Sequence, residues 1–320
     1  MILRKNLKRL KGDASHRTFF RNKKKGISSI FVYAKKDKKL NLLTYDAINQ
    51  ILLKNDILAP KLLSENYHRN YIEIEDFGDQ SIFYILKKNL SNKSLVFKKI
   101  IKLLIKIQSI KERQIINFKK KIYKIPIYKN KILFDEAKLF FDWYIVKKLS
   151  KSDQLIFKKK YIKIINNLIK KLKLKNNIFV HRDFHVSNLI KYKNHLAVID
   201  SQDAVKGNIA YDLASLIDDV RITSSNKLKK EAYNYYVKSK NKSFNQNFFL
   251  NDFEILSVLR NIKIIGIFTR LAVRDKKRKY LRLIPHAWKL IDYRMQNKKQ
   301  FKILKQIFDE NFSKKIRNLK

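Results

Sequence analysis

Two short apolar runs separated by a polar loop constrain this chain more than any other stretch. The first run, Ile178 to Val180, leads into the loop H-R-D-F-H-V-S-N, and a second run follows at Leu196 to Ile199. Short apolar runs bounded by polar turns predict short strands joined by tight loops. We therefore expect Asp183, Asn188 and Asp200 to meet at one end of a small hairpin.

The spacing of these three residues indicates a particular chemistry. The pattern H-R-D-x-x-x-x-N, followed by an aspartate after the next strand, is typical of a phosphoryl-transfer catalytic loop. Asp183 would accept the proton of an attacking hydroxyl. The amide oxygen of Asn188 and the carboxylate of Asp200 suit Mg²⁺ that bridges nucleotide phosphates. A β-hairpin with an ordinary polar turn is the alternative, since Asp and Asn are common turn residues; the ordered occurrence of all the parts favours catalysis with ATP and Mg²⁺.

The composition is that of a globular protein. The 320 residues suit about two domains, and 45% of them are hydrophobic. The absence of cysteine excludes disulfides and thiolate metal sites. The first thirteen residues lack the apolar core of a signal peptide, and no apolar run approaches the ~20 residues needed to span a bilayer. We expect a cytoplasmic protein without a membrane segment.

The net charge of +47 raises the question of nucleic-acid binding. The lysines are spread along nearly every segment instead of forming one stripe or tail, which is typical of a compositional bias of the whole chain. At this charge some salt-sensitive, non-specific binding of polyanions is expected. The same positive field would attract ATP and other anionic ligands.

The pattern of apolar residues predicts an α+β fold with two parts. Residues 1–78 are predicted to form a small β-rich lobe, with a hairpin over about 19–33, a helix over 40–53 and a strand over 71–75. From residue 81 onward apolar residues recur at three- and four-residue intervals. Residues 79–320 are therefore predicted to form a large helical lobe that also carries the catalytic hairpin and a substrate site.

These motifs together resemble the aminoglycoside-phosphotransferase/choline-kinase-like superfamily. His185 and the distal segment A-Y-D-L-A-S-L, which contains Asp212, are similar to those of small-molecule kinases. Protein kinases fit poorly, because the short stretch between Asp200 and Asp212 leaves no room for an activation segment. The resemblance implies a bilobal protein-kinase-like fold and an ATP-dependent phosphotransferase.

A closer resemblance exists to the bacterial kinases that phosphorylate N-acetylmuramate and N-acetylglucosamine at the anomeric position. It rests on G-D-A-S-H-R-T-F-F-R at residues 12–21, E-D-F-G-D at 75–79, E-A-K-L-F-F-D-W-Y at 136–144 and D-S-Q-D-A at 200–204, which occur in the same order in that family. The resemblance implies a small-molecule acceptor, an amino sugar, and a place in cell-wall recycling.

The resemblance also implies roles for residues around the nucleotide. Gly12, Ser15 and Arg17 would form a tight loop over the phosphates, although an ordinary turn is the alternative. Glu75 and Asp76 would lie at the hinge, where the backbone contacts adenine. Their side chains are equally compatible with a purely structural role.

Further residues are implied on the acceptor side and behind the catalytic loop. Glu136, Asp142 and Trp143 share a predicted helix and would offer carboxylates and an aromatic face to a sugar; core packing is the alternative for Trp143. Asp203 would be a second-shell metal or substrate group, or a solvated turn residue. The residues expected to brace the loop are His181, His185 and Asp212.

One departure from the kinase pattern concerns the lysine that kinases carry on the third strand. The corresponding stretch, I-F-V-Y-A-K-K at residues 30–36, does not place a lysine cleanly, and the next helix contains only Asp46 as an acid. Lys35 or Lys36 could take the place of this lysine. Alternatively, Arg17, Arg21 and Mg²⁺ could neutralise the charge of the phosphates.

Two other functions remain open from the sequence. A kinase of the same fold could act on choline, homoserine or an aminoglycoside; a polycationic aminoglycoside would need an acidic pocket, and only 27 acids stand against 74 Lys and Arg. A non-catalytic module that binds polyanions is the other alternative. The presence of Asp183, Asn188 and Asp200 together favours an enzyme.

Overall fold

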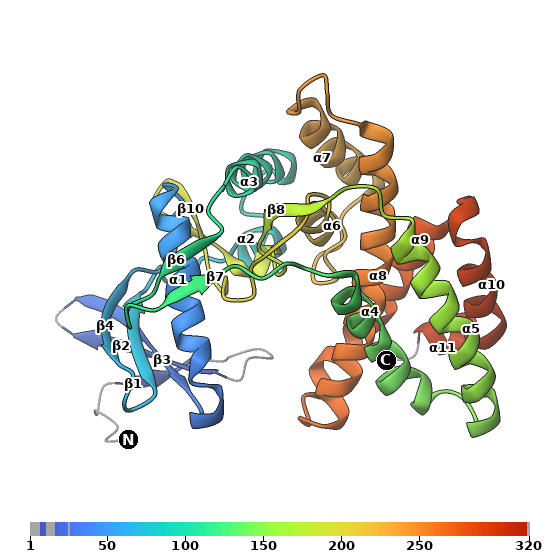
Figure 1. The fold of residues 1–320 in the computed structure, drawn as a ribbon, viewed down its shortest axis with the longest axis horizontal. Coiled ribbons are helices and arrows are strands. Elements are labelled where there is room, and N and C mark those ends of the chain that lie inside the picture. Colours follow the sequence, from blue (N-terminus) through green and yellow to red (C-terminus); the bar gives the residue numbers. More distant parts are fainter. Residues whose placement is uncertain (1–6, 11–16, 25, 319–320) are drawn as a thin grey trace. The chain divides into compact units, whose positions relative to one another are not determined.

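The computed structural model describes residues 7–10, 17–24 and 26–318 (Figure 1). Its contacts divide the chain into two compact units that exchange segments: Met1–Pro126 with Ile178–Lys206, and Ile127–Asn177 with Gly207–Lys320. The boundary that the sequence predicts between a small lobe (residues 1–78) and a large helical lobe (residues 79–320) stays a prediction. The mixed composition of sheet and helices confirms the α+β fold class.

The first unit is built on a five-stranded antiparallel sheet in the order β1-β2-β3-β5-β4. Its strands are β1 (Leu7–Arg9), β2 (Arg17–Lys24), β3 (Ile27–Ala34), β4 (Leu62–Asn66) and β5 (Tyr71–Glu75). The predicted hairpin is confirmed, since β2 and β3 pair from Arg17 opposite Ala34 to Lys24 opposite Ile27. Gly26 closes the turn at φ +82°, a conformation that glycine adopts without a steric penalty.

Helix α1 (Leu40–Lys54) covers one face of this sheet, and its bounds agree with the predicted helix. Leu42 and Tyr45 pack against Val32, Ala34 and other buried residues of β3 and β5. The strands alternate in burial because successive side chains point to opposite faces. One face of the sheet is thereby fixed against α1.

The remaining elements of the first unit are two helices and four short strands. They are α2 (Ile82–Lys87), α3 (Lys93–Gln108), β6 (Gln114–Ile116), β7 (Ile122–Lys124), β9 (Leu189–Tyr192) and β10 (His195–Val198). Along the chain, β8 (Asn176–Val180) and β11 (Val205–Asn208) each run across a boundary between the units. The side chains of Ser81 and Asn92 accept hydrogen bonds from the first turns of α2 and α3, as is typical of N-caps.

The second unit is helical. Its helices are α4 (Asn130–Leu139), α5 (Lys151–Lys170), α6 (Tyr211–Ile217), α7 (Asn226–Lys238), α8 (Gln246–Val273), α9 (Ile284–Met295), α10 (Lys302–Asn311) and α11 (Lys314–Asn318). The predicted helix that carries Glu136, Asp142 and Trp143 is interrupted, because α4 continues as a π-helical turn (Phe140–Tyr144) and a 3₁₀ turn (Ile145–Lys147). Within the described ranges, no helix is both long and apolar enough to cross a membrane.

Helix α8 passes very close to the point where the π turn begins. A Cβ atom on Gly266 would lie 2.4 Å from the carbonyl carbon of Leu139 and 2.5 Å from the amide nitrogen of Phe140. Glycine is therefore required there by the approach of two backbones. Phe140 in turn packs its ring against Trp288, 5.6 Å away between centroids.

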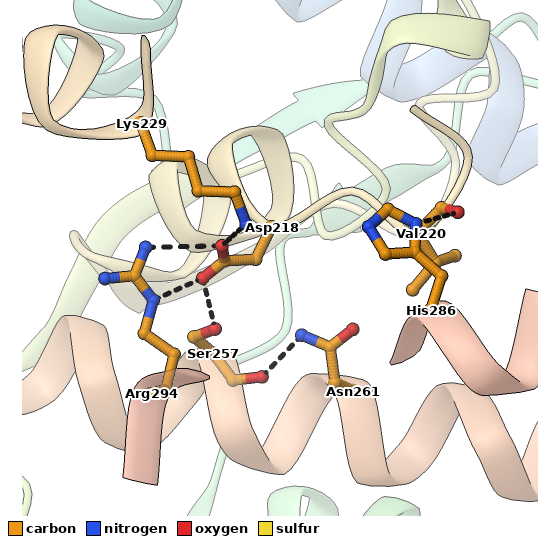
Figure 2. Close-up of polar contacts among 7 residues, drawn as sticks. All are labelled: Asp218, Val220, Lys229, Ser257, Asn261, His286 and Arg294. Carbon is orange, nitrogen blue, oxygen red and sulfur yellow. Dashed lines mark hydrogen bonds and ion pairs between the residues drawn. The ribbon is translucent and has the colours of Figure 1, made fainter. Parts of the chain in front are cut away.

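A buried carboxylate ties three helices of this unit together (Figure 2). Asp218, which follows α6, accepts hydrogen bonds from Lys229 of α7 at 2.8 Å, Ser257 of α8 at 2.6 Å and Arg294 of α9 at 2.6 Å. Burial opposes ionisation of Asp218, but Arg294 and Lys229 outweigh it and lower the pKa of this carboxyl. Asp218 is thus a fully buried, compensated charge.

Candidate phosphotransfer site

The predicted catalytic hairpin is present in the first unit. Strands β9 and β10 pair antiparallel, with Leu189 opposite Val198. Asn188 directly precedes β9, and Asp200 is the second residue after β10. The N–H of Ile199 donates to the carbonyl of Asn188 at 3.0 Å. Asn188 and Asp200 are thereby held at the same end of the hairpin.

Backbone hydrogen bonds fix this hairpin on both sides. The N–H of Lys191 donates to the carbonyl of Gln80 at 2.8 Å, ahead of α2. The N–H of Val198 donates to the carbonyl of Leu58 at 2.7 Å, after α1. Phe77 packs against Ile190 below the hairpin. The position of the hairpin within the unit therefore does not depend on side-chain contacts alone.

The loop between β8 and β9 is held by its own polar groups. The amide nitrogen of Asn188 donates to the carbonyl of Asp183 at 3.1 Å, which leaves the amide oxygen for other contacts. The N–H of Asn188 donates to the carbonyl of His185 at 2.9 Å. Burial lowers the pKa of His181, with Asp183 and Asp200 acting in the opposite direction, so His181 favours its neutral form. The bracing role expected of His181 and His185 stays a prediction.

Asp200 is the electrostatic centre of the site. Burial raises the pKa of its carboxyl, Asp183 adds to this effect, and Arg17 opposes it. Arg17 of β2 lies 2.5 Å from a carboxylate oxygen of Asp200. Asp200 and Arg182 both have positive φ, +61° and +70°. Such conformations cost energy in residues other than glycine and often occur at functional sites.

A polar contact that the sequence did not reveal supports Asp200. The hydroxyl of Ser201 donates to the side-chain oxygen of Asn49 at 2.6 Å, and the amide nitrogen of Asn49 donates to the carbonyl of Pro60 at 3.0 Å. Asn49 and Ser201 are buried. The available signal was an asparagine between apolar residues of α1, a position that needs a partner when buried.

A cavity of about 490 Å³ lies next to Asn188 and Asp200. Its remaining walls come from the sheet, from α1 and from the connection between β5 and α2. They include Phe19, Arg21, Ile30, Tyr45, Ile74, Glu75, Asp76, Phe77, Gly78, Asp79 and Ser187. Both apolar and polar groups line the cavity, as in sites for small molecules.

The predicted hinge residues have a clear structural environment. Asp76 accepts from Arg21 at 3.0 Å, from Ser28 at 2.5 Å and from the N–H of Gly78 at 2.8 Å. Burial opposes ionisation of Asp76, but these donors outweigh it and lower its pKa. Arg21 also binds Asp79 at 2.6 Å. Glu75 lines the cavity, and its N–H donates to the carbonyl of Lys61 at 2.9 Å.

Several predicted residues lie elsewhere. Gly12 and Ser15 fall outside the described residues. Asp203 belongs to the first unit and accepts from Gln202 at 2.8 Å. In the second unit, Asp212 is fully buried near the start of α6. Glu136 of α4 binds Lys263 at 2.9 Å and also accepts from the Tyr128 hydroxyl.

Asp142 and Trp143 lie in the π turn, so their register relative to Glu136 differs from that of a continuous α-helix. The Asp142 carboxylate lies 3.4 Å from the ammonium of Lys138, and both side chains are partly exposed. Trp143 is half-buried.

The site residues fit a divalent cation that is shared with a nucleotide. Across the described part of the chain, no group of three His, Cys, Asp or Glu residues could hold a metal by itself. The amide oxygen of Asn188 and the Asp200 carboxylate are hard oxygen donors of the kind that Mg²⁺ prefers. Because Mg²⁺ keeps waters and commonly binds nucleotide phosphates, two protein ligands suffice for a site completed by a nucleotide.

The sheet, the hairpin of β9 and β10 and the helical unit are the parts expected of a phosphotransferase with a kinase-like fold. The family model of the phosphotransferase enzyme family (APH) matches residues 6–239. The chain belongs to this family and is an ATP-dependent phosphotransferase.

A curated relative from Pseudomonas aeruginosa, the N-acetylmuramate/N-acetylglucosamine kinase, is 25% identical over 287 residues, which cover 88% of this chain and 81% of the relative.

Solved structures of low sequence identity share the fold. The choline/ethanolamine kinase family protein from Mesorhizobium loti superposes with a TM-score of 0.61 at 10% identity and covers 94% of this chain and 92% of its own. The ADP-bound aminoglycoside phosphotransferase APH(2'')-Ib superposes with a TM-score of 0.56 at 14% identity and covers 91% and 93%. The predicted kinase-like fold is confirmed.

Proposed function

We propose that this phosphotransferase transfers the γ-phosphoryl group of ATP to the anomeric hydroxyl of an amino sugar, N-acetylmuramate or N-acetylglucosamine. The observation that carries the proposal is the 25% identity, over 88% of this chain, to a relative named for these two sugars. The motifs at residues 12–21, 75–79, 136–144 and 200–204 support the same acceptor class.

In the proposed reaction the anomeric oxygen forms a bond to the γ-phosphorus while the bond to the β,γ-bridging oxygen breaks. The proton of the anomeric hydroxyl passes to the carboxylate of Asp183, and ADP leaves. The transition state is loose, so positioning and neutralisation of charge carry most of the catalysis. The anomeric hydroxyl is more acidic than an ordinary alcohol, which reduces the demand on Asp183 as a base.

The proposed metal residues are Asn188 and Asp200. Bound Mg²⁺ would neutralise charge on the β- and γ-phosphates. The hydrogen bond from Asn188 to the carbonyl of Asp183 keeps its amide oxygen available. The contact between Asn49 and Ser201 keeps the segment after Asp200 in place. We assign His181, His185 and Asp212 to support of this loop.

The cavity of about 490 Å³ is the proposed nucleotide site. The chain from Glu75 to Phe77 would contact adenine through its backbone. The side chain of Asp76 is already engaged by Arg21, Ser28 and the backbone of Gly78, which supports a structural role for it. Arg17 would act on the phosphates.

For the acceptor we retain Glu136, Asp142, Trp143 and Asp203 as proposed contacts. Lys263 and Tyr128 orient the carboxylate of Glu136. The half-buried ring of Trp143 is an aromatic face of the kind that packs against a sugar ring.

The test is an ATP-consumption assay with acceptors that differ at one position. We expect turnover with N-acetylmuramate and N-acetylglucosamine and none with the 1-O-methyl glycoside of N-acetylglucosamine, whose anomeric oxygen carries no proton. The product should lose its reducing end. Equal turnover of the methyl glycoside, or a preference for choline or an aminoglycoside in the same assay, would contradict the proposed acceptor.

A further inference from the structure

Strand β3 lacks the phosphate-binding lysine of kinases on the face where it would be needed. Its buried positions next to α1 are Ile30, Val32 and Ala34. Lys35 and Lys36 follow the strand and are exposed. If a side chain of this sheet holds the phosphates, the cation must therefore come from a strand other than β3.

Arg17 on the neighbouring strand β2 occupies the required face. Arg17 lies opposite Ala34, and Phe19 lies opposite Val32. Residues directly opposite in an antiparallel pair share a face of the sheet. Arg17 is 6% exposed, and its guanidinium lies 5.4 Å from the ring centre of Phe19 and 5.0 Å from that of Tyr45. Phe19 and Tyr45 both line the cavity.

Helix α1 does not supply the usual acidic partner for such a cation. Asp46 accepts hydrogen bonds from Gln50 at 2.6 Å and from the N–H of Phe118 at 3.0 Å. The residue that α1 directs at Arg17 is Tyr45, and the carboxylate that binds Arg17 is Asp200, at 2.5 Å. The cation thus contacts the same carboxylate that is proposed to hold the metal.

We propose that Arg17 exchanges partners during the binding of nucleotide and metal. In the structure Arg17 holds Asp200; when a divalent cation binds Asp200, the guanidinium would contact the phosphates of the nucleotide. The proposal deepens the proposed function because it uses the same nucleotide site, but it does not depend on the identity of the acceptor. An arginine suits this role because its planar fork binds either a carboxylate or a phosphate with two hydrogen bonds.

The exchange predicts opposite effects of Arg17 on the two ligands. Arg17 adds a contact to the nucleotide, whereas it competes with the metal for Asp200. If a ligand binds only one of two states of a protein, its apparent affinity falls in proportion to the fraction of the protein in that state. Removing Arg17 should therefore weaken binding of ADP and strengthen binding of a divalent cation alone.

Calorimetric titrations of Arg17→Gln with Mg²⁺-ADP and with adenosine, and titration with Mn²⁺ alone monitored by electron paramagnetic resonance, test this directly. We expect Kd for ADP to rise about tenfold or more, which is ~1.4 kcal/mol. Kd for adenosine should change less than about twofold, and Kd for Mn²⁺ should fall. Arg17→Lys should recover part of the ADP affinity.

Arg69→Gln is the matched control because Arg69 is an exposed arginine between β4 and β5. It measures how much ADP affinity is lost when any one charge is removed from a chain of net charge +47. Equal losses of ADP affinity in the Arg17 and Arg69 variants would overturn the proposal. Weaker Mn²⁺ binding by Arg17→Gln would also overturn it, because Arg17 would then only support Asp200.

A second variant tests the exchange with Arg17 intact, and no gain in its ADP affinity would overturn the proposal. In Asp200→Asn the guanidinium is no longer held by a carboxylate, so ADP should bind more tightly than to the wild type in the presence of EDTA. A gain that persists in the double variant Arg17→Gln, Asp200→Asn would reflect loss of repulsion by Asp200 and would overturn the exchange. Neither measurement uses an acceptor, so failure of the amino-sugar assay is distinguishable from failure here.

Discussion

Replacing the buried carboxylate of Asp218 by an amide should destabilise the helical unit strongly. Asp218 is inaccessible to solvent and compensates Lys229 and Arg294, whose side chains are 6% and 13% exposed. Asp218→Asn preserves the shape but leaves both cations without a charge partner. Removing one member of a buried ionic group typically costs ~3–5 kcal/mol. For a unit of this size, that corresponds to a decrease in Tm of roughly 6–20 °C.

The two tryptophans of the chain make this measurable in the second unit alone. Trp143 and Trp288 both belong to it, and the buried Trp288 shares α9 with Arg294. Urea or thermal unfolding followed by tryptophan fluorescence therefore reports the free energy of unfolding of the helical unit.

Asp135→Asn is the control for this prediction. Asp135 forms an exposed i,i+4 pair with Lys131 at 2.6 Å, and exposed pairs contribute ~0–1 kcal/mol. Similar stability losses in Asp218→Asn and Asp135→Asn would refute the view of Asp218 as the charge centre of the unit.

The same residue predicts a pH dependence. The pKa of Asp218 is lowered in the folded protein relative to an unfolded aspartate near ~3.9. Its contribution is therefore fully present above about pH 4 and is lost as the pH falls through the lower folded value. In Asp218→Asn this part of the acid sensitivity should be missing from fluorescence-monitored unfolding.

Three further substitutions test other parts of the structure. Asn49→Ala leaves the Ser201 hydroxyl and a buried carbonyl without their partner, so it should lower the free energy of unfolding by ~2–4 kcal/mol and also lower kcat. Hydrogen exchange and a double-mutant cycle with Ser201→Ala measure the loss of stability. A coupling energy near zero between Asn49 and Ser201 would contradict the expected contact. Gly266→Ala forces a Cβ into the α4 backbone and should cost ~3 kcal/mol or more; unchanged tryptophan-monitored stability would refute the close approach. Asp76→Asn should destabilise the first unit by loosening Arg21, while the adenosine affinity falls only modestly, as calorimetry would show; loss of stability without any retained adenosine binding would contradict a purely structural role.

Local sequence pattern predicted the elements that carry the proposed catalytic residues. The hairpin of β9 and β10, helix α1 and the hairpin of β2 and β3 all follow from short-range periodicity and turns. The site residues Asn188 and Asp200 could be placed together because a hairpin brings the ends of its strands to one side. The contacts within these hairpins and within this helix join residues that are close together in the chain.

Contacts between distant residues could not be predicted in this way. Arg17 and Asp200 are separated by 183 positions, and Asn49 and Ser201 by 152. A single sequence contains no signal that pairs them. The π turn was missed because its apolar spacing is compatible with a continuous helix, and Gly266, which approaches its start, lies on a helix more than a hundred residues later.

The role of Asp183 as the general base is tested by the turnover of Asp183→Asn with the best acceptor found in the ATP-consumption assay, measured together with the affinity of this variant for ADP. A positioned general base contributes ~10²–10⁴-fold. The site described here predicts a loss of kcat of about a hundredfold or more with Kd for ADP within about twofold of the wild-type value. A well-folded Asp183→Asn protein that turns over at close to the wild-type rate would contradict the assignment of this loop as the phosphotransfer site.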